Sequence, residues 1–232
     1  MRIKSPYPNP PQPPEGNAYY ILFGRQDLSG WPDFPAHIEA RTGEQLMHRE
    51  LISRIEALST GLASPPSQGG LGLASTALIG IIGENSSVCA SLTFIGVSSQ
   101  IRSLSQEYIT LFHACLRNAT TSVQISPHST TFELNHALSV SKPTCLFIDA
   151  DLLDRMLPAC TKAGIADDSI YILKARQDGK DMKGRRSCLS IIYDIKTKKT
   201  KTVPIRIAAK DSPAYLLFSS GTTGLPKGHS LS

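Results

Sequence analysis

The chain carries Ala214-Tyr-Leu-Leu-Phe-Ser-Ser-Gly-Thr-Thr-Gly-Leu-Pro-Lys-Gly228 near its carboxyl end, and the residue types of this stretch suit a specific chemistry. Its apolar run, Tyr215 to Phe218, has the length and aromatic content of a buried strand. Small residues follow at once, bringing hydroxyls and glycines, and then comes the cation of Lys227. Glycines let backbone N–H groups approach an anion closely, while hydroxyls and a lysine add further donors. The order of strand, small-residue loop and lysine therefore predicts a loop that binds polyphosphate.

A polar turn after a strand is the simpler interpretation of a loop rich in Gly, Ser and Thr. A Walker A loop is excluded because that motif needs Gly-Lys, whereas this chain has Pro226-Lys227. From Leu216 through Lys227, however, the sequence resembles the phosphate-loop signature of the adenylate-forming (AMP-binding) enzyme superfamily. That superfamily contains acyl-CoA synthetases, 4-coumarate:CoA ligases, luciferases and the adenylation domains of peptide synthetases. The resemblance makes a specific phosphate loop the better interpretation than a generic turn.

The resemblance extends upstream through most of the chain. Arg2-Ile-Lys-Ser-Pro-Tyr-Pro8 is similar to the opening of fungal-type 4-coumarate:CoA ligase-like enzymes. Ile79-Gly-Ile-Ile-Gly-Glu-Asn-Ser86 resembles the strand-to-helix turn near the start of the family, and Ile125 to His136 resembles a later segment that contains Glu-Leu. The chain therefore resembles the N-terminal part of an acyl-CoA synthetase of this type, and only that part.

The remaining pattern predicts alternating strands and helices. Helical spacing of Leu51, Ile55, Leu58 and Leu62 follows a capping-box sequence at Thr42 to Gln45, and the helix is expected to end near Gly61 or Ser64-Pro65-Pro66. Strands are predicted over residues 77–82, 122–125, 145–148, 170–173 and 215–218, the last of these being the final strand. Further helices are predicted after Thr130, with Glu133 as its capping-box partner, and from Asp151 to a break near Pro158. This alternation predicts an α/β fold with a mainly parallel sheet, whose carboxyl edge is where ligands bind.

The domain organisation predicted from the sequence has two parts. Residues 1–41 are expected to form an extended proline-rich arm, because residues 5–14 contain six prolines. Residues 42–232 are expected to form an incomplete N-terminal domain of an AMP-dependent synthetase/ligase, with residues 96–110 as an apparent insertion. Because residues 96–110 look like extra length within one continuous helix of the family, we hypothesise a mispredicted or retained intron. Because the later family motifs have no counterpart before Ser232, we hypothesise a truncated reading frame as well.

What the resemblance implies about function is a ligase reaction. A carboxylic acid would react with Mg-ATP to give an acyl-adenylate, and CoA would then displace AMP to form a thioester. ATP, Mg²⁺ and CoA are thus the implied cofactors, with no complete catalytic set and no metal ligands in this chain. Carried over by position, the phosphate-binding residues are Ser219, Ser220, Gly221, Thr222, Thr223, Gly224 and Lys227. Because the rest of the active site would lie downstream, the 232 residues alone are expected to be inactive.

Composition sets further limits. No run is long and apolar enough to span a bilayer, and the amino end lacks the apolar stretch of a signal peptide, so a cytoplasmic or peroxisomal location is expected. Five cysteines without a C-x-x-C pair indicate reduced thiols. His229 stands too early to match the family's histidine.

The charge of the chain is uneven and leaves two other interpretations open. The net charge of +5 is concentrated in residues 174–210, which carry twelve Lys or Arg against three Asp. A solvated basic surface is the usual meaning of such a segment, and nucleic-acid binding is the sharper one, although aromatic partners are nearly absent there. A non-catalytic module that binds a partner through the proline arm or this basic segment is the other alternative.

Overall fold

The computed structural model describes residues 17–23, 30–38, 43, 45–83, 106–175, 184–209, 211–219 and 227–231. The helices and strands, in chain order, are α1 Ala18–Phe23, β1 Pro35–Ile38, β2 Gln45–Met47, α2 His48–Ala63, η2 Pro66–Gln68, β3 Leu78–Ile82, α3 Gln106–Arg117, β4 Thr121–Ile125, α4 Thr131–Ser141, β5 Cys145–Ile148, α5 Leu153–Lys162, η4 Asp167–Ser169, β6 Ile170–Ile172, α6 Cys188–Thr197, β7 Tyr215–Ser219 and β8 Lys227–Leu231. Predictions for residues 1–16, 84–86 and 96–105 lie outside the described residues.

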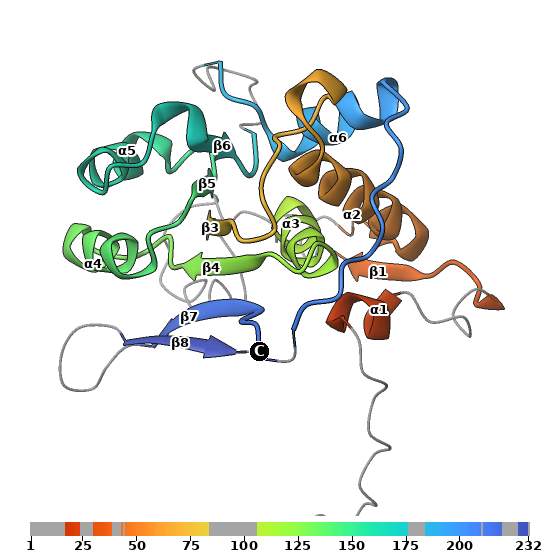
Figure 1. Cartoon of the computed structure of the whole chain (residues 1–232), viewed down its shortest axis with the longest axis horizontal. Helices are drawn as coiled ribbons and strands as arrows, with labels where there is room; N and C mark the ends of the chain where they lie inside the picture. Colours follow the sequence, from red (N-terminus) through yellow and green to blue (C-terminus); the bar gives the residue numbers. More distant parts are fainter. Residues whose placement is uncertain are drawn as a thin grey trace, which may run out of the picture.

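One central sheet organises these elements. Its strand order is β6-β5-β3-β4-β7-β8, with a separate antiparallel pair made by β1 and β2 (Figure 1). The first five strands in this order run parallel, and β8 pairs with β7 in the antiparallel direction. The predicted α/β fold with a mainly parallel sheet is therefore confirmed.

Helices cover both faces of the sheet in a regular way. The connections through α3 and α6 lead toward the β8 edge, and both helices pack in the core on the first face. The connections through α4 and α5 lead toward the β6 edge and pack on the second face. Connections that lead toward opposite edges of the sheet therefore lie on opposite faces. This arrangement is expected when all crossovers between parallel strands have the same handedness.

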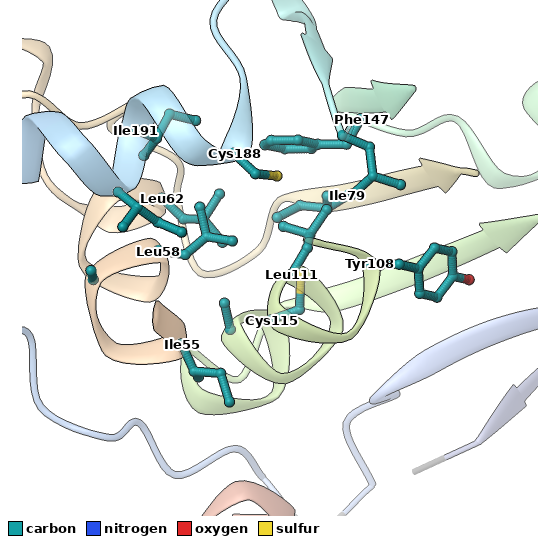
Figure 2. Close-up of a cluster of buried hydrophobic side chains, with 14 of the residues drawn as sticks. Ile55, Leu58, Leu62, Ile79, Tyr108, Leu111, Cys115, Phe147, Cys188 and Ile191 are labelled. Atoms are coloured by element: carbon teal, nitrogen blue, oxygen red, sulfur yellow. The ribbon is translucent and has the colours of Figure 1, made fainter. Parts of the chain in front are cut away.

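Alternation along the strands divides the apolar side chains between the two cores. In β3, Ile79 and Ile81 face the first core and Ile82 faces the second. In β5, Phe147 joins the first core while Leu146 and Ile148 join the second. Figure 2 shows the first core, where side chains of α2, α3 and α6 meet those of β3 and β5. Strands with both faces covered read as continuous apolar runs, which is why the sequence predicted them well.

Helix α4 begins as the sequence predicted. The Thr130 hydroxyl accepts from the backbone N–H of Glu133 at 3.3 Å, and the Glu133 carboxylate accepts from the backbone N–H of Thr130 at 2.8 Å. These bonds satisfy N–H groups that the first turn of a helix leaves without partners. The carboxyl end of the adjacent strand β4 is thereby followed by a well-defined turn and helix.

Two predicted helix boundaries were wrong. Helix α2 begins at His48 rather than after Thr42, because Gln45–Met47 pairs with β1 as strand β2. Helix α5 is not broken near Pro158 but runs through it, since buried Leu153, Met156 and Cys160 anchor it on both sides of the proline. Proline removes one helical hydrogen bond, and this loss falls on the exposed side of α5.

Two elements near the carboxyl end were missed or misplaced. Helix α6 was not predicted, although Ser187 caps it and Ile191, Ile192 and Ile195 form its buried face. Tyr215–Phe218 is a strand as predicted, but it is not the last one, because β8 follows and pairs with it. The low strand propensity of Gly228 and Ser230 hid β8, whose pairing is supplied by its neighbour.

The amino-terminal segment is not wholly an extended arm. Within it, α1 packs on α3 and Tyr19 is buried. Asn17 fixes this contact, since its side-chain amide donates to the carbonyl oxygens of Leu116 and Arg206, each at 2.6 Å. Residues 106–110 of the segment predicted as an insertion form the first turns of α3; the insertion itself stays a prediction.

Two further observations bear on earlier expectations. Cys115, Cys145, Cys160 and Cys188 are free and buried, and burial raises the pKa of each thiol. In the described part of the chain, none of the helices has the length and apolar character to cross a membrane.

Candidate functional site

The base of the predicted phosphate loop is formed by the hairpin β7–β8. Ser219, the last residue of β7, is paired with Lys227, the first residue of β8. Of the seven predicted phosphate-binding residues, the structure places the backbone of these two and brings them opposite each other. The other five lie between them, outside the described residues. The hairpin thus joins the two ends of a short connection made of residues 220–226.

Neighbouring strands position this hairpin at one edge of the sheet. Strand β7 runs parallel to β4, with Ser122 opposite Tyr215 and Gln124 opposite Leu217. The Thr121 hydroxyl also donates to the carbonyl oxygen of Pro213 at 2.7 Å, which fixes the entry to β7. Because the strands are parallel, Ser219 lies at the same edge where β3, β4, β5 and β6 end. Ligands of parallel α/β sheets bind at this carboxyl edge.

The turn after β4 lies beside the hairpin. Residues 126–130 lead into α4, and the N–H groups of Thr130 and Glu133 bond within the capping box. The hydrogen bonds from the N–H and hydroxyl of Thr130 lower the pKa of Glu133. Arg155 also donates to the carbonyl oxygen of Pro127, which ties this turn to α5. These bonds hold the turn in place between β4 and α5.

Asp149 and Tyr108 lie near the centre of the same edge, and neither was predicted from the sequence. The helices that follow β3 and β5 leave to opposite faces, so a topological switch point lies between these neighbouring strands. Gly83 follows β3 and Asp149 follows β5. A Cβ atom on Gly83 would lie 3.1 Å from Asp149 Oδ2 and 2.5 Å from Leu173 Cδ2, so the end of β3 passes close to the Asp149 carboxylate. Asp149 is buried at this point, and its place directly after the apolar run 145–148 was the available signal.

Tyr108, in the first turns of α3, is the second such residue. Figure 2 shows its ring directed away from the packed cluster around Leu111. Burial, and in second place the charge of Asp149, raises the pKa of Tyr108 to about 12. The phenol therefore remains protonated at neutral pH and keeps its O–H as a donor. The described residues contain no group of three or more His, Cys, Asp or Glu side chains arranged to hold a metal ion.

Comparison with known sequences shows which family the chain resembles. The profile described as AMP-binding enzyme matches residues 103–232. Two curated relatives from Aspergillus niger are an acyl-CoA ligase, azaF, 31% identical over 102 residues, and a phenylacetyl-CoA ligase, epaB, 30% identical over 102 residues. Each alignment covers 44% of this chain and 19% of the relative, so the matched part is a small share of those proteins.

Comparison with solved structures gives the same fold. The apo structure of MatB from Rhodopseudomonas palustris superposes with a TM-score of 0.60 at 20% identity, covering 93% of this chain and 34% of MatB. The ATP-bound form of MatB gives a TM-score of 0.59 over the same shares. A luciferase-like enzyme from Zophobas morio gives 0.60 at 18% identity, covering 84% of this chain and 38% of that enzyme.

Proposed function

This chain belongs to the AMP-binding enzyme family, and on that premise we propose that its β7–β8 hairpin binds the outer phosphates of ATP. Ser219, Ser220, Thr222 and Thr223 supply hydroxyls, Gly221 and Gly224 allow the loop to approach the phosphates, and Lys227 supplies the positive charge. The observation that carries this proposal is the pairing of Ser219 with Lys227 at the carboxyl edge of a parallel sheet.

The chemistry of these residues fits ATP. Phosphate oxygens accept from backbone N–H groups, hydroxyls and ammonium groups, and these are the donors that the sequence places between Ser219 and Lys227. The backbone of Lys227 is paired with that of Ser219, so these two residues stand at the two ends of the connection. A loop with these donors stabilises negative charge on the departing pyrophosphate while holding the phosphates in line.

The reaction we propose for the whole enzyme is that of an acyl-CoA synthetase. A carboxylic acid attacks the α-phosphate of ATP, which releases pyrophosphate and gives an acyl-adenylate. The thiol of CoA then displaces AMP and forms the thioester. Mg²⁺ bound with ATP neutralises phosphate charge in such reactions. The two Aspergillus relatives, described as an acyl-CoA ligase and a phenylacetyl-CoA ligase, support CoA and a carboxylic acid as substrates.

We assign to these 232 residues the phosphate-binding part of that reaction and no turnover of their own. The chain spans 19% of the length of the curated relatives it matches, and the solved structures extend well beyond the part that it covers. A pyrophosphate-release assay with ATP, Mg²⁺, CoA and aryl or fatty carboxylates is expected to show no carboxylate-dependent signal. Turnover that depends on the carboxylate would contradict this assignment. A cytoplasmic or peroxisomal location belongs to the same proposal.

Limited proteolysis tests the phosphate loop itself. Subtilisin suits the experiment because it does not depend on Lys227, whereas trypsin would lose its site in the variant. Mg-ATP and pyrophosphate are expected to slow cleavage within residues 220–226, and AMP is expected to have little effect. In Lys227→Ala the protecting concentration of ATP should rise roughly 10- to 100-fold, because a hydrogen bond to a charged group contributes about 1.5–3 kcal/mol.

The matched control is Lys162→Ala, which removes an exposed lysine at the end of α5. This variant should be protected like the original chain. Equal protection of the original chain and Lys227→Ala, or protection by AMP alone, would contradict a loop that holds the outer phosphates.

A further inference from the structure

Helix α6 carries exposed apolar side chains on its outward side. Its inward side is formed by Cys188, Ile191, Ile192 and Ile195, all buried in the first core. On the outward side, Leu189 is 44% exposed and Tyr193 is 68% exposed. These two residues are four apart, and Lys196 follows three later, so all three lie along one stripe of the helix. We call Leu189, Tyr193 and Lys196 the α6 stripe.

A cluster of lysines continues the stripe at the carboxyl end of α6. It consists of Lys196, Lys198, Lys199 and Lys201, and all four are exposed. Across the described residues no carboxylate lies within ion-pair distance of any of the four. The one acidic residue of α6, Asp194, is instead bonded to Arg186 at 2.8 Å. The positive charge of the lysine cluster is therefore available to an external partner.

Backbone hydrogen bonds hold this cluster in a defined turn. Lys199 has a φ of 51°, and its N–H donates to the carbonyl oxygen of Lys196 at 3.2 Å. The next N–H, of Thr200, donates to the carbonyl oxygen of Ile195 at 3.1 Å. Together these bonds make a Schellman turn. The residue in the left-handed conformation of such a turn is usually glycine, and here it is Lys199. Lys199 takes this position at a backbone cost of roughly 1 kcal/mol, as Lys142 does at the end of α4.

The loop next to the cluster has no charged residue of its own, and the Arg186–Asp194 pair lies against its Gly69 and Gly70 carbonyl oxygens. Residues 64–77 contain no Lys, Arg, Asp or Glu, and Gln68 in this loop accepts from the Thr200 hydroxyl at 2.8 Å. The stem of Lys198 lies against the same loop, since a Cβ atom on Gly69 would be 3.3 Å from Lys198 Cδ. A stem held against this loop directs the ammonium group outward.

Neither of two simpler explanations accounts for the whole surface. Lysines at a helix carboxyl end interact favourably with the helix dipole, but this does not explain exposed Leu189 and Tyr193 beside them. Single-stranded nucleic acid is bound by basic grooves with several stacking aromatics, and Tyr193 is the one aromatic residue on this surface. A cluster of four exposed lysines favours contact with anionic lipid headgroups, and exposed Leu and Tyr side chains beside it can enter the headgroup region.

We propose that α6 docks the chain on an anionic membrane surface. Leu189 and Tyr193 enter the headgroup region, and the lysine cluster contacts the negatively charged lipid headgroups. The apolar side chains supply buried area, and the lysines supply attraction that depends on the anionic lipid and on ionic strength. This inference is independent of ATP binding at the β7–β8 hairpin, which lies at the carboxyl edge of the sheet.

Vesicle flotation of the full chain tests the charge part of the proposal. The chain should bind vesicles of phosphatidylcholine with about 30% phosphatidylserine and should bind pure phosphatidylcholine far more weakly. Lys198→Gln/Lys201→Gln should lower the partition coefficient about 30-fold, which corresponds to about 1 kcal/mol for each lysine. The matched control is Lys142→Gln/Lys162→Gln, which removes the same charge from exposed positions on the opposite face and should change binding little.

A second pair of variants tests the apolar part. Tyr193→Ser should weaken vesicle binding about fivefold or more, since an exposed ring loses its burial in the lipid interface. Phe132→Ser on α4 is the control, because Phe132 is 67% exposed, nearly as much as Tyr193. Equal losses in the test and control variants, or equal binding to neutral and anionic vesicles, would overturn the proposal. Tighter binding to a DNA or RNA oligonucleotide than to vesicles, insensitive to Tyr193→Ser, would assign the surface to nucleic acid instead.

Discussion

Replacing Gly61 by alanine tests the contact between α2 and α6. The Cβ atom of an alanine there would lie 2.2 Å from Ile191 Cγ2 and 3.3 Å from Ile195 Cγ1. Ile191 Cγ2 is attached directly to a buried Cβ in α6, so it cannot swing aside as the tip of a long side chain could. One helix must move, and the apolar core in Figure 2 must repack.

Two opposing effects set the size of the change. Alanine in place of glycine favours a helix by up to about 1 kcal/mol. Overpacking a filled core costs typically about 1–3 kcal/mol. The clash involves a β-branched side chain that is fully buried, so we expect the core term to prevail. Gly61→Ala should therefore lower the free energy of unfolding by about 1–2 kcal/mol.

Urea unfolding followed by circular dichroism measures this change, and a double-mutant cycle gives its cause. In an Ile191→Ala background the clashing methyl is gone, so Gly61→Ala should become neutral or stabilising, with a coupling energy of about 2 kcal/mol. Leu189→Ala, on the exposed side of the same helix, should leave the cost unchanged. A stabilising Gly61→Ala in the original chain, or a cost that persists after Ile191→Ala, would refute the packing of α6 on α2.

Three other predictions concern local features. Thr130→Ala should lower the free energy of unfolding by about 1 kcal/mol in urea titrations, because it removes the cap of α4; an unchanged midpoint would contradict the capping box. Burial lowers the pKa of His113 to about 4, below its value of 6.5 in an unfolded chain, so the unfolded state binds more protons between these values. Stability should therefore be full above pH 6.5 and fall toward pH 4, and melting curves of His113→Phe should lose part of this dependence. Ala119 has a φ of 52°, so Ala119→Gly should raise stability by about 1 kcal/mol, whereas Ala137→Gly inside α4 should lower it by a similar amount.

The parallel strands could be predicted because their sequences are continuous apolar runs of strand length. Residues 78–82 and 145–148 are short apolar runs bounded by polar or small residues, which is what a strand covered on both faces requires. The capping box at Thr130 likewise marked the start of α4, since its two side chains act locally. Local chemistry and long-range packing agree in these segments.

The missed elements depend on contacts with distant residues. Helix α6 is followed by a polar, lysine-rich segment, and the burial of Ile191 and Ile195 comes from packing on α2. Strand β8 contains glycine and serine and forms through its pairing with β7. The capping-box spacing at Thr42 does not start a helix, because the residues after it pair with β1 as strand β2. This pairing is not visible in the local sequence pattern.

The candidate site shows the same division. The phosphate-binding role of the loop between Ser219 and Lys227 was predicted from residue order and stays a prediction, while the structure places the base of the loop at the carboxyl edge of the sheet. Asp149 and Tyr108 were not identified, because their proximity depends on the packing of α3 against the ends of β3 and β5. Residues that are far apart in the sequence can be recognised as neighbours only when the fold is known.

Hydrogen exchange of the β7–β8 hairpin measures whether its backbone N–H groups bind the outer phosphates of ATP. Peptides that span Tyr215 to Leu231 would be followed by mass spectrometry with Mg-ATP, pyrophosphate or AMP, each compared with the chain alone. Binding of outer phosphates to backbone N–H groups predicts slower exchange in residues 220–226 with ATP and pyrophosphate, little change with AMP, and loss of the effect in Lys227→Ala. Exchange in residues 220–226 that is the same with and without ATP, while another part of the chain responds, would contradict the claim that this hairpin binds the nucleotide's phosphates.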